Sequence, residues 1–73
     1  MKDKEIEKKL SMLLDYWIEH NREHSQEFRE WAEKAEASGE PDVSRVIRQA
    51  ADEMDAATEH LAQAKKQLAV EET

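Results

Sequence analysis

The residues of this chain best suited to metal chemistry are its three histidines, His20, His24 and His60. His20 and His24 are one helical turn apart, so their imidazoles can chelate one divalent ion from the same face of a helix. His60 lies about as far after the break formed by Gly39 and Pro41 as His20 lies before it. A chain that folds back at this break therefore brings His60 beside His20.

Two carboxylates are expected next to these histidines. Glu27 follows His20 by one heptad, and Glu53 precedes His60 by one heptad, so the two columns meet when the helices are antiparallel. A site of imidazoles completed by a carboxylate or water suits Zn, Ni, Co, Cu or Fe(II), and the sequence does not choose among them. We therefore predict a small metal-binding carrier, sensor or accessory protein whose ligands are His20, His24, His60, Glu27 and Glu53.

An alternative interpretation gives the histidines a structural role. Asn21 and His24 fall within a heptad seam, where a polar residue can set the register or the oligomeric state of packed helices. The chain is then a non-catalytic structural or protein-interaction module with histidines in its core. The sequence leaves both interpretations open.

Catalysis finds little support. The segment from His20 to His24 matches the H-x-x-E-H pattern of one class of metalloprotease, but short motifs often match by chance. A chain of 73 residues has no room for the cleft and distant third ligand of such an enzyme. The Glu-x-x-His pairs of di-iron bundles are absent, and no serine has a convincing base partner. We predict that the protein is not an enzyme.

The apolar residues recur at heptad spacing and predict an all-α chain of two long helices. The seam of the first half consists of Leu10, Leu14, Trp17, Asn21, His24, Phe28, Trp31 and Ala35. The seam of the second half consists of Val43, Ile47, Ala50, Met54, Ala57, Leu61, Ala64 and Leu68. We expect one domain over residues 1–73, with helix one at about 3–37, a turn at 38–41 and helix two at about 42–70.

Local signals support these limits. Asp3 is suited to the N-cap of the first helix, and Gly39 is suited to the position just after its end. Pro41 fits the first turn of the second helix, where Asp42 complements the helix dipole.

The short connection makes the two helices antiparallel neighbours, so the numbers of facing residues sum to about 80. This register places Trp31 over Ala50 and Trp17 over Ala64. Pairing large side chains with small ones lets helices interdigitate, so we expect both tryptophans in the core.

A lone hairpin leaves further apolar surface uncovered. Ile6 and Leu13 form a second column beside the first seam, and Val46 lies beside the second seam. We therefore predict a homodimer that forms a four-helix bundle. The alternative is a module that docks on another protein.

Composition excludes several classes of partner. The net charge of −7 argues against nucleic acid, because binding to phosphates depends on basic residues. No apolar stretch approaches the roughly 20 residues that span a bilayer. The N-terminal segment is charged and does not resemble a signal peptide, and the chain has no cysteine. We expect a cytoplasmic protein that contacts neither membrane nor nucleic acid.

The run from Trp17 to His24, followed by the run from Phe28 to Ala32, resembles small uncharacterised two-helix domains of prokaryotes. The resemblance extends over about Trp17 to Leu68. It implies the hairpin fold, and it implies neither an activity nor a catalytic residue.

Overall fold

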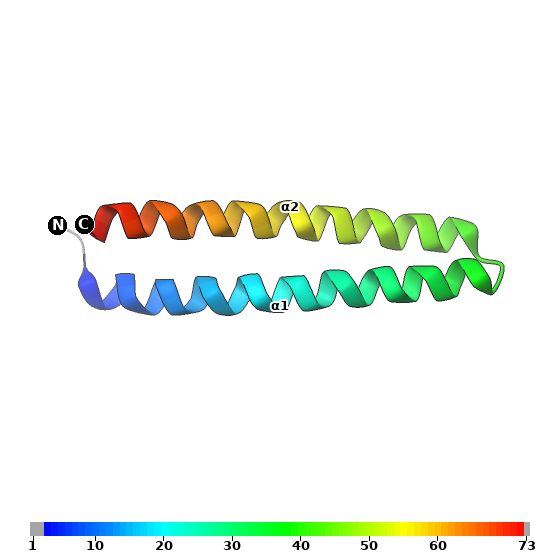
Figure 1. The fold of residues 1–73 in the computed structure, drawn as a ribbon, viewed down its shortest axis with the longest axis horizontal. Helices are drawn as coiled ribbons and strands as arrows, with labels where there is room; N and C mark the ends of the chain where they lie inside the picture. The colour runs from blue at the N-terminus through cyan, green and yellow to red at the C-terminus, as the bar shows by residue number, and fades with distance from the viewer. Residues whose placement is uncertain (1–2, 73) are drawn as a thin grey trace.

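A computed structural model describes residues 3–72, with side chains described through Leu68, as two long helices joined by a short turn (Figure 1). Helix α1 spans Lys4–Ala37 and helix α2 spans Pro41–Glu72. The start of α1 and the end of α2 lie at the same end of the hairpin (Figure 1). The predicted all-α helical hairpin is confirmed, and the helices begin and end within two residues of the expected positions.

The first helix begins at a side-chain cap. The Asp3 carboxylate accepts hydrogen bonds from the backbone N–H of Glu5, at 2.9 Å, and of Ile6, at 3.2 Å. These bonds satisfy two of the N–H groups that have no partner inside the helix, which stabilises the first turn. The expected N-cap is confirmed.

The turn between the helices closes through two backbone hydrogen bonds. The N–H of Gly39 donates to the carbonyl of Glu36, at 3.1 Å, and the N–H of Glu40 donates to the carbonyl of Ala35, at 2.9 Å. This is the Schellman arrangement, which needs a left-handed residue after the helix. Gly39 supplies it with a φ of +88°. Pro41 then starts α2 with a backbone angle suited to a first helical position.

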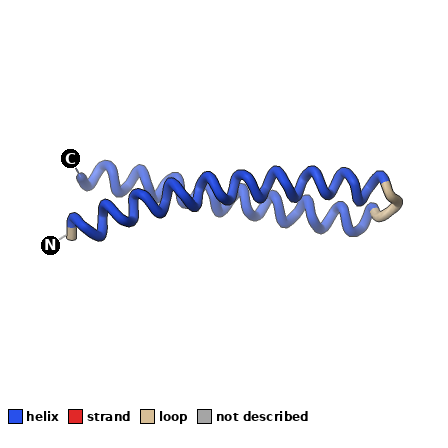
Figure 2. Tube along the Cα trace, turned by 90° about the horizontal axis from the view of Figure 1, so that it is seen from below, coloured by secondary structure: helices blue, strands red, loops and turns tan. Residues whose placement is uncertain are grey.

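The hairpin is a thin rod with extents of 56 × 14 × 14 Å. The two helices cross at a shallow angle along its length (Figure 2). Ser25 contacts Asp55, and Asp15 contacts Lys65, so the numbers of facing residues sum to about 80 as the short turn requires.

The residues buried between the helices differ in part from the predicted seams. We call this line of buried and half-buried residues the inner seam. On α1 it comprises Ser11, Leu14, Ile18, Asn21, Ser25, Phe28, Ala32 and Ala35, and on α2 it comprises Ser44, Ile47, Ala51, Met54, Thr58, Leu61 and Leu68. Half of each predicted seam, including Leu14, Phe28 and Met54, belongs to the inner seam. The other half of each predicted seam, including Trp17 and Trp31 on α1, lies in the heptad column beside the inner seam.

The expectation that both tryptophans pack between the two helices is therefore wrong for the hairpin. Trp17 is 38 % exposed and Trp31 is 57 % exposed, whereas Ala32 and Ala51 are completely buried. Small side chains let the helices approach more closely than a line of tryptophans would allow. Close approach at the small residues turns the tryptophans to one side of the pair.

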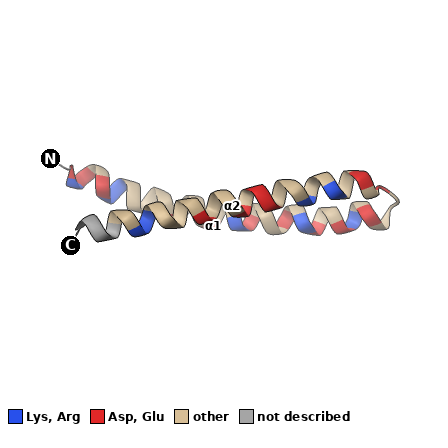
Figure 3. Cartoon of the chain, turned by 90° about the horizontal axis from the view of Figure 1, so that it is seen from above, with Lys and Arg blue, Asp and Glu red and all other residues tan. Residues whose placement is uncertain are grey.

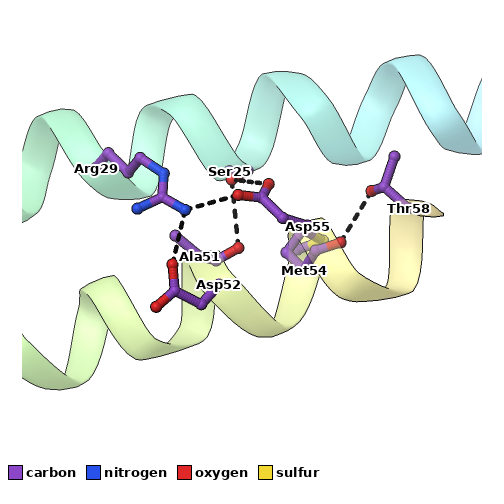
Figure 4. Close-up of polar contacts among 7 residues, drawn as sticks. All are labelled: Ser25, Arg29, Ala51, Asp52, Met54, Asp55 and Thr58. Carbon is purple, nitrogen blue, oxygen red and sulfur yellow. Dashed lines mark hydrogen bonds and ion pairs between the residues drawn. The ribbon is translucent and has the colours of Figure 1, made fainter.

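A polar network crosses the inner seam near its middle (Figure 4). The buried Ser25 hydroxyl donates to the Asp55 carboxylate at 2.5 Å, and Arg29 donates to Asp55 at 2.6 Å and to Asp52 at 2.9 Å. The Ser25 hydroxyl and then the Arg29 guanidinium lower the pKa of Asp55, because both stabilise its charged form. The hydrogen bonds to Asp52 and Asp55 raise the pKa of Arg29. The network links the helices at one register.

Candidate functional site

An extended apolar surface lies exposed along one face of the hairpin, and we call it the open face. It comprises Ile6, Leu10, Leu13, Trp17 and Trp31 of α1 and Val43, Val46, Ala50, Ala57 and Ala64 of α2. Every one of these side chains is exposed in the hairpin. Among the large hydrophobic residues exposed between residues 3 and 68, only Met12 and Tyr16 lie away from this face.

Helical geometry puts the contributions of both helices on the same side. Trp17 follows the seam residue Leu14 by three positions, and Ala57 follows the seam residue Met54 by three positions. The same offset rotates both side chains to the same flank of their helices. Two antiparallel helices are related by a two-fold axis perpendicular to the plane that contains them. Residues at the same offset from the seam on either helix therefore lie on the same face of the hairpin.

The ion pairs between the helices occupy the opposite face. Their residues follow the seam at other offsets, as Asp15 follows Leu14 and Asp55 follows Met54. Among the described side chains, the pairs between the helices are Arg29 with Asp52 and Asp55, Arg48 with Glu36, and Lys65 with Asp15. Acidic and basic residues are interspersed along both helices, with uncharged stretches between them (Figure 3). The hairpin is therefore polar on one face and apolar on the other.

His20 and His24 lie at the edge of the open face, close to the middle of α1. Their Nε2 atoms are 3.0 Å apart, so one ring donates a hydrogen bond to the other. Tyr16 stacks on the ring of His20, with centroids 5.4 Å apart, and Phe28 lies 6.2 Å from the ring of His24. The four rings form a ladder at successive helical turns. The predicted pairing of these two imidazoles is found.

His60 lies on α2 and makes a different contact. Its Nδ1 lies 2.9 Å from the backbone carbonyl oxygen of Ala56, a distance at which Nδ1–H donates to that oxygen. The ring is exposed, and it has no hydrogen bond to His20 or His24. Each helix is rotated about its axis relative to the predicted packing. This rotation turns the columns that contain His20 and His60 away from the contact between the helices, so the two histidines do not meet across the hairpin.

The predicted convergence of five ligands within one hairpin is therefore wrong. Among residues 3–68, no group of three His, Asp or Glu side chains is arranged to hold a metal ion. Glu27 and Glu53 are exposed, each on its own helix. What the hairpin does assemble is a pair of imidazoles beside an apolar face. Metal binding by the chain stays a prediction.

The heptad pattern predicts Trp17 and Trp31 between the two helices of one hairpin, whereas the structure exposes both on the open face. The signal was present in the sequence, because each helix carries apolar residues beside its inner seam and a contact between two helices covers only part of each apolar stripe. The predicted exposure of Ile6, Leu13 and Val46 in a lone hairpin is confirmed.

Comparison with known proteins gives a family and one relative. Residues 10–68 match the family described as Domain of unknown function (DUF8180). An uncharacterized protein of Archaeoglobus fulgidus is 39 % identical over 44 residues, which cover 60 % of this chain and 69 % of the relative. No solved structure matches the chain. Neither helix, over the residues described, is long and apolar enough to cross a membrane.

Proposed function

The chain belongs to the DUF8180 family of domains, and from the geometry of its hairpin we propose that it is a non-catalytic association module that pairs with a second copy of itself. The observation that carries this proposal is the open face. Two hairpins that join through this face form a four-helix bundle, an arrangement that buries the apolar residues which each hairpin leaves exposed.

The exposed area agrees with a missing partner. The hairpin exposes 5927 Å² of surface. A compact monomer of this length exposes about 4,700 Å², so the excess is about 1,200 Å². Stable dimers bury about 800 Å² or more from each partner. The excess therefore exceeds what a stable homodimer needs.

Charge favours a second copy as the occupant. The chain carries a net charge of −7, whereas the open face is made of apolar residues, with Lys34 over the ring of Trp31 and with Glu27 and Glu53 at its edge. Apart from Glu27 and Glu53 at its edge, the face can meet its own copy without placing like charges against each other. In such a bundle Trp17 and Trp31 pack at the centre, where the heptad pattern predicts them.

Sedimentation equilibrium of the metal-free chain tests the proposal. We expect twice the mass of one chain for the native protein, and the mass of one chain for the Trp31→Glu variant. Trp31 is 57 % exposed in the hairpin, so a charge there disturbs the dimer more than the hairpin itself.

Met12→Glu is the matched control. Met12 lies on the same helix and is 72 % exposed, but it is outside the open face, so this variant stays dimeric. A native chain that sediments as a monomer at all concentrations would contradict self-association. The open face would then be covered only in a metal-bound dimer or by a different protein partner.

A further inference from the structure

We propose that the protein binds a divalent transition metal between two copies, through His20 and His24 of one copy and His60 of the partner subunit. This inference rests on the proposed homodimer, because a single hairpin does not bring the three imidazoles together. A symmetric dimer contains two such sites, one for each α1.

The first two ligands are already arranged as a chelating pair. The Nε2 atoms of His20 and His24 are 3.0 Å apart. Two imidazole nitrogens bound to one tetrahedral zinc ion at about 2.1 Å lie about 3.4 Å from each other. The hydrogen bond between the rings therefore holds both nitrogens close to the separation that a metal needs.

The protons of these two rings can be rearranged without a change of charge. In the hydrogen-bonded pair, one ring carries its proton on Nε2 and the other accepts at Nε2. When the donor ring holds its proton on Nδ1 instead, both Nε2 lone pairs are free for a metal ion. Tyr16 and Phe28 contact the outer sides of the pair and limit the rotation of the rings.

His60 has the features of a third ligand. Its Nδ1 donates to the backbone carbonyl of Ala56, which fixes the tautomer and leaves the lone pair on Nε2. Histidines that bind metals commonly donate their other ring N–H to a carbonyl or carboxylate in this way. The ring of His60 is exposed, and its Nε2 makes no hydrogen bond to the residues whose side chains the structure describes.

The sizes of the side chains on the open face indicate how two copies pair. The column of α1 is bulky, with Trp17 and Trp31, and the column of α2 is small, with Ala50 and Ala64. A two-fold axis along the bundle places α1 of each copy against α2 of the other, so that bulky residues meet small ones on both sides. An α1-against-α1 dimer would place bulky residues together on one side and alanines on the other.

The same symmetry aligns the histidines. Within the hairpin, residues at one level have numbers that sum to about 80, so His20 is level with His60. A two-fold axis along the bundle preserves that level, which sets the pair on α1 opposite the partner's His60. Glu27 comes level with the partner's Glu53, and a cation nearby offsets the repulsion between these carboxylates.

A cobalt(II) titration of chelator-treated protein, followed by visible absorption, measures the site. We expect saturation at one cobalt ion per chain, with bands typical of a tetrahedral ion. The bands are lost in His24→Ala and in His60→Ala. Gln67→Ala, which changes an exposed residue in the same column as His60, keeps them. Circular dichroism checks that each variant is helical.

A mixing experiment tests whether the ligands come from two copies. The double variant His20→Ala/His24→Ala retains only His60, and His60→Ala retains only the pair on α1. Neither homodimer has a complete site, but a heterodimer of the two has one. We expect the cobalt bands to reappear, at half the native intensity per heterodimer, when the two variants are unfolded together and refolded.

The outcomes separate this inference from the proposed function. Suppose that the chain is a dimer without metal. If that dimer binds no cobalt, or if the His60→Ala variant keeps the cobalt bands, the shared site is overturned and self-association is left intact. A heterodimer without cobalt bands overturns it as well. A chain that is monomeric without metal and dimeric with cobalt supports the site and contradicts metal-independent association. A monomer under both conditions contradicts both proposals.

Discussion

Two buried serines of the inner seam differ in how their hydroxyl groups are satisfied. Ser25 is 4 % exposed and donates to the Asp55 carboxylate, which lies across the seam. Ser44 is 1 % exposed, and its hydroxyl has no hydrogen-bond partner within the described part of the chain. A buried polar group without a partner opposes folding, whereas a bonded one contributes to stability.

We expect opposite effects when each serine is replaced by alanine. Ser25→Ala loses the hydrogen bond and lowers the free energy of unfolding by about 1 kcal/mol. Ser44→Ala removes an unpaired hydroxyl and improves helix propensity, so it raises the free energy of unfolding by about 0.5–1 kcal/mol. Urea unfolding of the two variants beside the native protein measures both changes. Equal destabilisation by the two would show that the hydroxyl of Ser44 is satisfied in solution.

Asp55 makes stability depend on pH in the acid range. Its pKa is lowered in the folded state by the Ser25 hydroxyl and then by Arg29, so the folded state binds fewer protons than the unfolded state. The resulting stabilisation is present above the unfolded value of about 3.9 and is lost as the pH falls through the lowered folded value. We therefore expect Asp55→Asn to be less stable than the native protein at pH 7. The difference should shrink below about pH 4.

Urea unfolding at a series of pH values between neutral and strongly acid measures this difference. A constant difference at every pH would mean that the charge of Asp55 contributes nothing. The loss in the variant would then come from altered hydrogen bonding alone.

At the scale of the helices, the inner seam depends on small residues that are completely enclosed. Ala32 and Ala51 have no exposed surface, so each is enclosed by the contact between the helices. Local signals determine where α1 and α2 begin and end, as the cap at Asp3 and the left-handed Gly39 show. The separation of the helices is instead determined by what the inner seam can accommodate.

Enlarging Ala51 should push the helices apart. We expect Ala51→Leu to lower the free energy of unfolding by about 2 kcal/mol, because a well-packed seam has no space for the added methyl groups. Ala56→Leu is the matched control on the same helix. Ala56 is exposed and lies outside both the inner seam and the open face, so its replacement changes stability by less than about 0.5 kcal/mol. Equal losses in the two variants would argue against close packing at Ala51.

At the scale of the whole molecule, the two faces of the hairpin differ in the contacts that they can make. The ion pairs between the helices and the Ser25 network lie on or beside the polar face, and they link α1 to α2. The open face carries the tryptophans and lies next to the histidine pair. Two helices form a single layer, which leaves the open face exposed. Association through the open face would bury it in a second layer.

Self-association predicts that thermal stability depends on protein concentration. When a folded dimer unfolds to two separate chains, a 100-fold rise in concentration stabilises the dimer by about 2.7 kcal/mol. For a dimer of this size, the midpoint of thermal unfolding, Tm, should rise by roughly 9 °C. Circular dichroism at several concentrations measures the shift. A Tm that does not change with concentration would indicate a monomer.

The sequence by itself determined the helices, their ends, the antiparallel turn and the register. Each of these depends on local features: heptad spacing, the Asp3 cap, Gly39 after α1 and Pro41 at the start of α2. It also identified His20 and His24 as a pair, because residues four apart on a helix are neighbours whatever the helix packs against.

Only the tertiary structure decided which apolar columns face the other helix. On α1, Leu14 and Phe28 belong to two overlapping seams, one completed by Trp17 and Trp31 and the other by Ser25 and Ala32. Both seams have heptad spacing, so periodicity cannot separate them. The small residues prevail because they allow close approach and bring opposite charges into contact across the polar face. That rotation leaves the tryptophans exposed and keeps His60 away from His20 within one hairpin.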